Sequence, residues 1–233
     1  MQTLLKTTGA AFMKDLVFLL KHDAQFLSRS AEERKKEVET HLGQQYPESL
    51  TGYLLKVTAD QFKQEFHHVI QVLEGVAQPD LENGFLNALA DFFAQEMGMM
   101  LDALSLDFFF RPLKDRLQAL GEMLPEKSTV GKVLKHQFCE STYQEVTAAV
   151  QTALETLKKA PVVVVQTPIE LEGGMRKEIR HHFAKKHPHA FVEFQINPKI
   201  LGGMRLFVNG EVEDLSWLAK VQAITKLKSL QST

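Results

Sequence analysis

Residues 197–217, NPKILGGMRLFVNGEVEDLSW, form the most specific stretch of the sequence and decide the predicted fold of its C-terminal part. The Gly-Gly pair at 202–203 permits unusual backbone dihedrals or close backbone packing where a strand begins. The Asn-Gly pair at 209–210 is the dipeptide that a two-residue type I′ hairpin turn prefers. Asp214 or Ser216 can cap a helix that follows. The stretch therefore predicts two short strands joined by a hairpin, with a helix after them.

The residues in front of this stretch complete a small α/β domain. PVVVVQT, which begins at Pro161, is a run of β-branched residues typical of a buried strand. Thr167 is a predicted helix cap with Pro168 in the first turn, and the helix is expected to end near Lys186. HAFVEFQI reads as a second strand. We therefore expect residues 160–233 to form a β-α-β-β-β-α domain.

Residues 1–159 show the periodicity of helices instead. Phe12, Leu16 and Leu19 recur at three- and four-residue spacing, which indicates an amphipathic helix with one apolar face. Short polar breaks separate this helix from several others, as in an antiparallel helical bundle. The predicted fold class is therefore α+β, with an N-terminal all-α bundle followed by the small α/β domain.

Several helix boundaries in the bundle can be predicted from capping residues and prolines. Helices are expected to begin at Ser30 and at Asp60. A single helix is expected from about residue 81 to 110, because Pro112 then forces a stop or a kink. Another follows Pro112, and a last one runs from Ser128 or Ser141 to Lys159. The many Phe and Met residues of 85–110 are interpreted as core, with a groove for a partner helix as the alternative for part of this apolar surface.

Composition excludes several classes of protein. The chain has 233 residues and a formal net charge of −2, whereas a general nucleic-acid binder needs a strong basic excess. The one cysteine, Cys139, rules out an internal disulfide framework and is expected to pack as a small apolar residue. No apolar stretch reaches the roughly 20 residues that a transmembrane helix needs. Any association with a membrane is therefore expected to go through a partner.

No catalytic, cofactor or metal site is predicted. His181, His182, His187 and His189 suggest zinc, but adjacent helical residues point about 100° apart and no Cys or carboxylate stands at a supporting spacing. The Gly-Gly pairs lack the context of a phosphate-binding loop. Cys139 has no triad partners, and no nucleophile elbow is present. These patterns indicate a binding or structural protein.

The C-terminal pattern resembles the delta subunit of F-type ATP synthases, which is called OSCP in mitochondria. The resemblance rests on an apolar approach to a Gly-Gly pair, a strand, a Gly-containing turn and an acidic step into the last helix. The matching residues are Pro198, Ile200, Leu201, Gly202, Gly203, Gly210, Val212, Asp214 and Ser216. Asn197 stands where the family usually has Asp. The bundle in front is longer than is usual for the family and lacks its N-terminal signature.

The resemblance implies a non-catalytic stator subunit. Such proteins link the catalytic α/β hexamer to the peripheral stalk, so that the hexamer does not turn with the rotor during proton-driven ATP synthesis. The bundle, residues 1–159, would bind N-terminal helices of the α subunits. The α/β domain, residues 160–233, would bind b-type stalk helices. The protein would lie peripherally at the cytoplasmic face of a bacterial inner membrane, or at the matrix face of the mitochondrial inner membrane.

Two other functions fit parts of the pattern. The E-type stalk subunit of vacuolar and archaeal ATPases also has a Gly-Gly pair before a strand in a C-terminal α/β domain, but it usually begins with one long charged helix. A helical adaptor unrelated to ATPases would make the C-terminal match accidental. Co-purification of ATP synthase subunits separates these possibilities.

Overall fold

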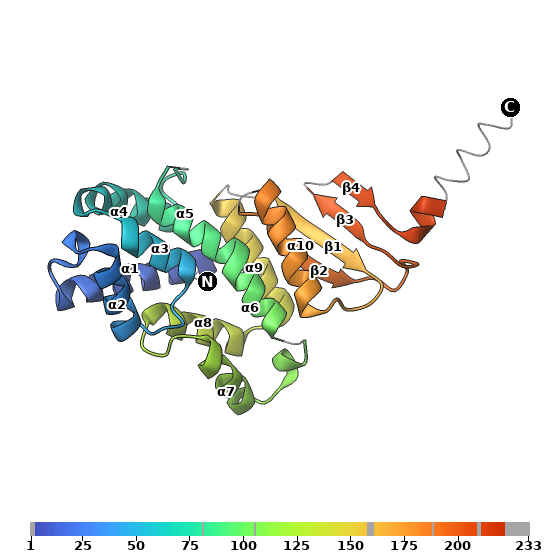
Figure 1. Ribbon diagram of the computed structural model, residues 1–233, viewed down its shortest axis with the longest axis horizontal. Coiled ribbons are helices and arrows are strands. Elements are labelled where there is room, and N and C mark those ends of the chain that lie inside the picture. The colour runs from blue at the N-terminus through green and yellow to red at the C-terminus, as the bar shows by residue number, and fades with distance from the viewer. Residues whose placement is uncertain are drawn as a thin grey trace. The chain divides into compact units, whose positions relative to one another are not determined.

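The protein comprises two compact units, residues 1–159 and residues 160–233, each with its own secondary structure (Figure 1). A computed structural model describes residues 3–80, 82–104, 106–157, 161–187, 189–208 and 211–221. The described part of the first unit contains only helices, and that of the second contains a four-stranded sheet with helices. The predicted α+β fold class is confirmed.

The first unit consists of α-helices joined by short turns. They are α1 (Leu4–His22), α2 (Ala31–His41), α3 (Glu48–Lys56), α4 (Ala59–Leu73), α5 (Gly84–Asp91), α6 (Met97–Ala103), α7 (Leu113–Met123), α8 (Thr129–Glu140) and α9 (Tyr143–Thr156). Shorter helical segments are η1 (Phe26–Ser28), η2 (Phe92–Glu96) and η3 (Leu106–Phe110). The first helix, α1, packs against α2, α4, α8 and α9 and so lies at the centre of the unit.

Polar side chains begin most of these helices. The caps of α1, α2, α4, α5, α8 and α9 are Thr3, Ser30, Thr58, Asn83, Ser128 and Thr142, whose side-chain oxygens each accept a backbone N–H of the first turn. The predicted start at Ser30 is confirmed, with a capping box completed by Glu33. The predicted cap Asp60 is wrong, because Thr58 caps α4 and Asp60 lies in its first turn.

An aromatic cluster fills the core between α1, α3 and α5. The rings of Phe12 and Phe85 stack with their centroids 4.6 Å apart, and both are almost fully buried. Tyr53 meets them edge-on at 5.8 and 5.6 Å. Such pairs contribute about 0.5–1.5 kcal/mol beyond the burial of their area. The core interpretation of the Phe-rich stretch is confirmed for Phe92 and Phe93, which are also fully buried, but it is wrong for Phe110 and Met99, which are 87% and 45% exposed.

The stretch from residue 81 to 110 is not the single helix that its pattern predicts. A π-helical turn, η2, separates α5 from α6, and the chain leaves the helix at Leu104 before η3 begins. The turn contains two adjacent side chains, Phe92 and Phe93, that are both fully buried. The last predicted helix is likewise two helices, because Ser128 caps α8 and Thr142 starts α9 after a break at Ser141.

Three helices of the first unit are capped by carboxylates from other helices. Asp15 of α1 accepts the first two N–H groups of α8 at 2.6 and 3.0 Å. Glu65 of α4 does so for α5 at 3.0 and 3.2 Å, and Glu96 for α3 at 2.8 and 2.7 Å. Each carboxylate satisfies donors that have no partner within their own helix, and its charge faces the positive end of the helix dipole. Burial nevertheless raises the pKa of Glu96, and these hydrogen bonds partly offset that effect.

A buried arginine donates hydrogen bonds to backbone carbonyl groups at the C-terminal end of α3. The Arg34 guanidinium donates to the carbonyl oxygens of Val57 at 2.7 Å and Leu54 at 3.1 Å. It also donates to the carbonyl oxygens of Leu27 and Arg29. Because these acceptors lie in or next to η1 and at the end of α3, Arg34 joins both segments to its own helix, α2.

The second unit is built on a mixed sheet. Its elements are β1 (Val162–Thr167), α10 (Gly173–Lys186), β2 (Phe191–Ile196), β3 (Arg205–Val208) and β4 (Glu211–Asp214), and the strand order is β2-β1-β3-β4. The β1–β2 pair is parallel, and the other two pairs are antiparallel. Residues 217–221 are helical, as the start of the predicted last helix. The predicted order β-α-β-β-β-α therefore holds for the described residues.

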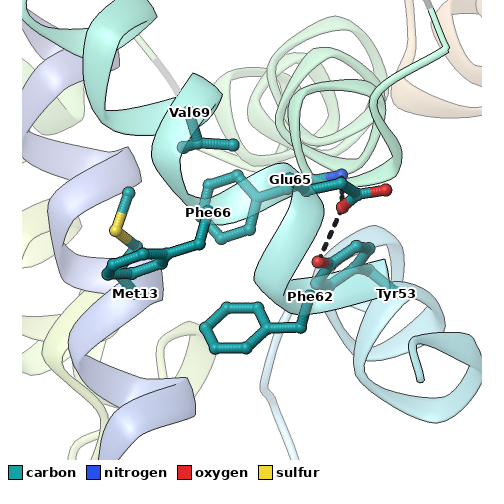
Figure 2. A pocket seen from close by; sticks show the side chains of 7 residues that line it. Met13, Tyr53, Phe62, Glu65, Phe66 and Val69 are labelled. Atoms are coloured by element: carbon teal, nitrogen blue, oxygen red, sulfur yellow. Dashed lines mark hydrogen bonds between the residues drawn. The ribbon is translucent and has the colours of Figure 1, made fainter. Parts of the chain in front are cut away.

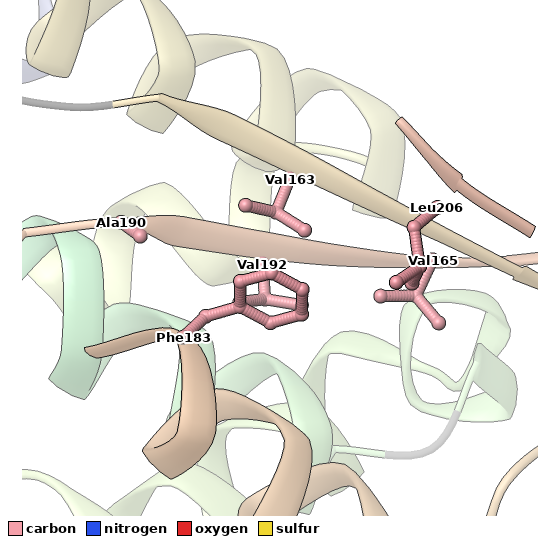
Figure 3. Packing of buried hydrophobic residues seen from close by; sticks show 6 residues of the cluster. All are labelled: Val163, Val165, Phe183, Ala190, Val192 and Leu206. Carbon is pink, nitrogen blue, oxygen red and sulfur yellow. The ribbon is translucent and has the colours of Figure 1, made fainter. Parts of the chain in front are cut away.

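Packing of α10 on one face of the sheet forms the core of this unit. Figure 3 shows Phe183 of α10 directed towards Val192 of β2. The core members are Val163, Val165, Phe183, Ala190, Val192 and Leu206. Burial alternates along β1, so this strand is covered fully on one face only. The run of valines predicted a strand correctly but overstated its burial.

The predicted start of α10 is wrong. Glu172 occupies the position before the helix, and its side chain makes no capping hydrogen bond. The Thr167 hydroxyl instead donates to the carbonyl oxygen of Ile169 at 2.7 Å, which is a local turn. The helix therefore begins at Gly173, five residues after Pro168.

Candidate functional site

The turn between β2 and β3 begins at an anchored asparagine. The Asn197 backbone N–H donates to the carbonyl oxygen of Thr167 at 2.7 Å, and its side-chain amide donates to the side-chain oxygen of Gln166 at 2.9 Å. Its side-chain oxygen accepts the Lys199 N–H at 3.2 Å. An Asp here could accept the last bond but could not donate to Gln166. Asn197 therefore ties the turn to the end of β1.

The residues after Asn197 form a tight turn. The Ile200 N–H donates to the Asn197 carbonyl at 3.1 Å, which places Pro198 at the second position of a four-residue turn. Proline suits this position because its ring presets φ. Ile200 is buried, whereas Leu201 is 67% exposed. The apolar pair of the motif thus has one side chain directed inward and one at the surface.

Both glycines of the motif adopt a left-handed backbone, with φ of 75°. A Cβ on Gly203 would lie 2.5 Å from the Leu215 carbonyl oxygen and 3.0 Å from the Ser216 Cα. A Cβ on Gly202 would lie 3.1 Å from the indole of Trp217. A side chain at position 203 would therefore clash with backbone atoms, whereas one at position 202 would contact only the side chain of Trp217.

The other end of the motif closes against this turn. The Trp217 N–H donates to the Gly202 carbonyl at 3.2 Å, and Leu215 donates to Met204 at 2.9 Å. Of the two predicted caps, Ser216 performs the role, because its hydroxyl oxygen accepts the Ala219 N–H at 3.3 Å. The double-glycine turn and the start of the last helix are thus held together by backbone hydrogen bonds.

Asp214 supports this junction from its side. Its carboxylate accepts the Ser216 N–H at 2.9 Å and the Arg205 guanidinium at 2.8 and 3.2 Å. Hydrogen bonds from Ser216, and then from Arg205, lower the pKa of Asp214 from its ordinary 3.8 to about 2. One motif residue remains, Gly210. It lies with Asn209 outside the described residues, and the residues on either side of them, Val208 and Glu211, pair in the sheet.

The other residues considered as sites from the sequence are the histidines and the cysteine. Among the described residues, no group of three or more His, Cys, Asp or Glu side chains is placed to hold a metal ion. His181 and His182 lie on the exposed side of α10. Cys139 is buried at the end of α8, and burial raises the pKa of its thiol, which keeps it protonated and unreactive. The double-glycine motif itself reaches the surface, where Leu201 is exposed.

That surface carries four exposed apolar side chains, which we name the Trp217 patch: Leu201, Trp217, Leu218 and Val221. Their exposed fractions are 67%, 67%, 49% and 58%. The pattern of the last helix predicts that Trp217, Leu218 and Val221 share one side. It does not predict that this side is open, because spacing cannot distinguish a face that meets the core from one that meets a partner.

The first unit also has apolar surface. Figure 2 shows a shallow notch in which Phe62 and Phe66 of α4 lie near Met13 of α1, beside the hydrogen bond of 2.8 Å from the Tyr53 hydroxyl to Glu65. A second group of exposed apolar side chains lies at the end of η3 and in α7. We call it a stripe. It consists of Phe110, Leu113 and Leu117, which are 87%, 49% and 40% exposed.

Part of the chain matches a known protein family. The model of the ATP synthase delta (OSCP) subunit family matches residues 113–227. Over that range the chain is similar to this family. The match confirms the resemblance and extends it in front of the second unit to α7, α8 and α9, while α1 to α6 stay outside it. No curated protein matches the chain.

The match supports a subunit of the ATP synthase complex and is consistent with a peripheral location. None of the helices in the described ranges is long and apolar enough to cross a membrane.

Proposed function

We propose that this protein is a non-catalytic peripheral-stalk subunit of an F-type ATP synthase. It would link the catalytic α/β hexamer to the b-type stalk and resist the torque of the rotor. The observation that carries the proposal is the family match over residues 113–227, which includes the double-glycine motif and the sheet. We further propose that it lies at the cytoplasmic face of a bacterial inner membrane, or at the matrix face in a mitochondrion.

The surfaces of the two units suit a link of this kind. A stator contact must hold under load, and exposed ion pairs contribute only about 0–1 kcal/mol each. Apolar side chains that become buried against a partner helix contribute more, and both units expose such side chains. In this proposal the first unit binds N-terminal helices of α subunits, and the stripe of Phe110, Leu113 and Leu117 is its most exposed apolar surface. The second unit binds the stalk.

The alternative of an E-type stalk subunit has less support. That class usually has one long, highly charged helix at its start. Here α1 has 19 residues, and its Leu4, Phe12, Leu16 and Leu19 are buried in a compact core. An unrelated adaptor would leave the family match over residues 113–227 without a cause.

Purification of the protein with its native partners tests the proposal. An affinity-tagged copy is expressed in the source organism, and gently solubilised membranes are purified through the tag. Co-purification of α, β and b-type subunits is the expected result. Their absence, in a preparation where the tagged protein is folded, would show that the proposal is wrong.

A coupling measurement tests the mechanical role separately. Replacement of Gly203 by Val should disrupt the second unit and release the stalk, because the added side chain meets the backbone of Leu215 and Ser216. ATP hydrolysis by the hexamer should persist, while ATP-driven proton pumping should fall. Full coupling in this variant would contradict the proposed role of the second unit.

A further inference from the structure

A hollow of about 260 Å³ lies between the α7–α8 connection and the first half of α8. An apolar cavity of about 150 Å³ is large enough for benzene, so this hollow has room for a small organic molecule. It belongs to the first unit and is separate from the double-glycine motif, which lies in the second. Its lining residues are Leu124, Pro125, Glu126, Gly131, Lys132 and Lys135.

Fixed contacts hold the walls of the hollow in place. A Cβ at Gly131 would overlap the carbonyl oxygen of Pro125, so the connection lies directly against the backbone of α8. The Ser128 hydroxyl donates to that carbonyl at 3.4 Å, and its oxygen accepts the Gly131 N–H at 2.9 Å. The Lys127 ammonium donates to the carbonyl oxygen of Thr40 at 3.1 Å, which ties the connection to α2. A ligand therefore meets a pre-organised site and does not have to order these residues.

The walls combine an apolar surface with two ammonium groups. Leu124 and Pro125 provide the apolar part. Lys132 and Lys135 lie three positions apart and so project from one side of α8. The Lys135 ammonium pairs with Glu126 at 3.6 Å, but the Glu126 side chain is 73% exposed, so this pair is weak. Among the described residues, Lys132 has no ion-pair partner.

A third cation lies near this side of α8. Burial raises the pKa of the Cys139 thiol. The charge of Arg116 opposes that shift, Glu140 adds to it, and Lys135 opposes it. Because Lys135 and Cys139 are four positions apart, Arg116 of α7 lies near the side of the helix that carries Lys135. The Arg116 Nε is buried and has no hydrogen-bond partner in the described part of the chain.

We propose that this hollow is a binding site for a small organic anion. The carboxylate or phosphate group of the ligand contacts Lys132 and Lys135, since lysine binds both groups as a point charge. Its carbon atoms lie against Leu124 and Pro125. A neutral apolar molecule would take water from the two ammonium groups and return no hydrogen bond, and a metal ion would find no lone pair on them. The inference goes beyond the proposed function and does not depend on it.

Titration of the full-length, ¹⁵N-labelled protein with three probes of similar size tests the inference. Phenyl phosphate and benzoate carry the two anionic groups, and benzyl alcohol has the same ring without a charge. The backbone amide signals of residues 124–135 should shift and saturate with at least one anion, and the tighter anion identifies the preferred group. The Kd of benzyl alcohol should be at least about tenfold weaker, because it leaves both ammonium groups without an anion.

Two variants and a matched control make the test specific. Lys132→Ala should weaken binding of the anion about three- to tenfold, and added salt should weaken it in the wild type. Glu126→Gln should strengthen binding severalfold, because it removes the carboxylate that competes for Lys135. A variant that merely disturbed the fold would not bind more tightly. Lys63→Ala removes an exposed lysine of α4 outside the hollow and should bind as the wild type does.

Four outcomes would overturn the inference. The first is the absence of a saturable shift with either anion, and the second is saturation only at residues outside 124–135. The third is wild-type affinity in Lys132→Ala together with no gain in Glu126→Gln. The fourth is equal affinity for benzyl alcohol and the anions. The stator proposal is judged by co-purification of the α, β and b-type subunits, so none of these results bears on it.

Discussion

Replacement of Gly203 by alanine isolates the physical role of the double-glycine motif. Gly203 has a φ of 75°, and an added Cβ would lie 2.5 Å from the carbonyl oxygen of Leu215. The left-handed conformation alone costs an L-residue about 1–2 kcal/mol. The contact with backbone cannot be relieved by rotation of a side chain, so the segment from Leu215 to Trp217 must move.

That movement breaks the two hydrogen bonds between the turn and the segment. These are the bond of 2.9 Å from Leu215 to Met204 and the bond of 3.2 Å from Trp217 to Gly202. Each contributes about 1 kcal/mol. The expected loss is therefore about 3–4 kcal/mol. A domain of this size has roughly 4–11 kcal/mol of stability in total, so the loss is a large part of it.

Two other glycines provide matched controls. Gly75 has a φ of 77° with nothing within 4 Å of an added Cβ, so Gly75→Ala should cost only the conformational term of about 1–2 kcal/mol. Gly173 lies at the start of α10 without positive φ and also in open space. Gly173→Ala should stabilise the second unit by about 0.5–1 kcal/mol. Together the three variants separate the cost of a positive φ from the cost of the contact between the added Cβ and the backbone.

Urea denaturation monitored by Trp217 emission measures the effect, since the only tryptophan lies in the second unit beside Gly202. Hydrogen exchange of the β1 and β3 amides provides an independent value, and far-UV circular dichroism measures Gly75→Ala in the first unit. If Gly203→Ala lies within 1 kcal/mol of the wild type, the turn does not depend on the close backbone approach and our reasoning about the motif is refuted.

Three further predictions concern charged groups. Asp15→Ala should destabilise the first unit by about 2–4 kcal/mol in chemical denaturation, because it leaves buried donors of α8 without an acceptor, whereas Asp60→Ala should cost less than 1 kcal/mol. Arg34→Lys should cost about 2–3 kcal/mol in the same assay, because one ammonium cannot reach all the carbonyls that the guanidinium bonds; equal stability would contradict that account. Asp214 has a pKa lowered to about 2, so its stabilising effect is present above its ordinary 3.8 and is lost as pH falls through about 2. Carboxyl NMR titration checks this, and a midpoint near 3.8 would refute it.

The second unit was largely predictable because its signals are local. Gly202 and Gly203 need a particular backbone, and a β-branched run such as that after Pro161 favours a strand in any context. The start of α10 was not predictable in the same way. Thr167 and Pro168 have the chemistry of a helix start, but the Thr167 hydroxyl is used in a turn. Competition between two local hydrogen bonds decided that boundary.

The first unit was predictable in class but not in detail. Capping residues located α2, yet nothing in the spacing of residues 81–110 revealed a π-helical turn. That turn contains Phe92 and Phe93, which are both buried, and Glu96, whose carboxylate accepts a backbone N–H of α3, and these are tertiary contacts. The exposure of the Trp217 patch was hidden for a similar reason. A pattern shows which residues share a face, and only the packed structure shows what that face meets.

The carboxylate of Asp15 has a consequence for how this chain can be divided. The family match begins at residue 113, which suggests a fragment from residue 113 onwards for expression. Such a fragment would contain α8 but not Asp15, whose carboxylate accepts the first two N–H groups of that helix from 114 and 115 positions away. It would also expose the side of α8 that packs on α1. We therefore expect the segment that matches the family model to be unstable as a separate fragment, and we expect a cut near residue 159 to leave each unit with its own contacts.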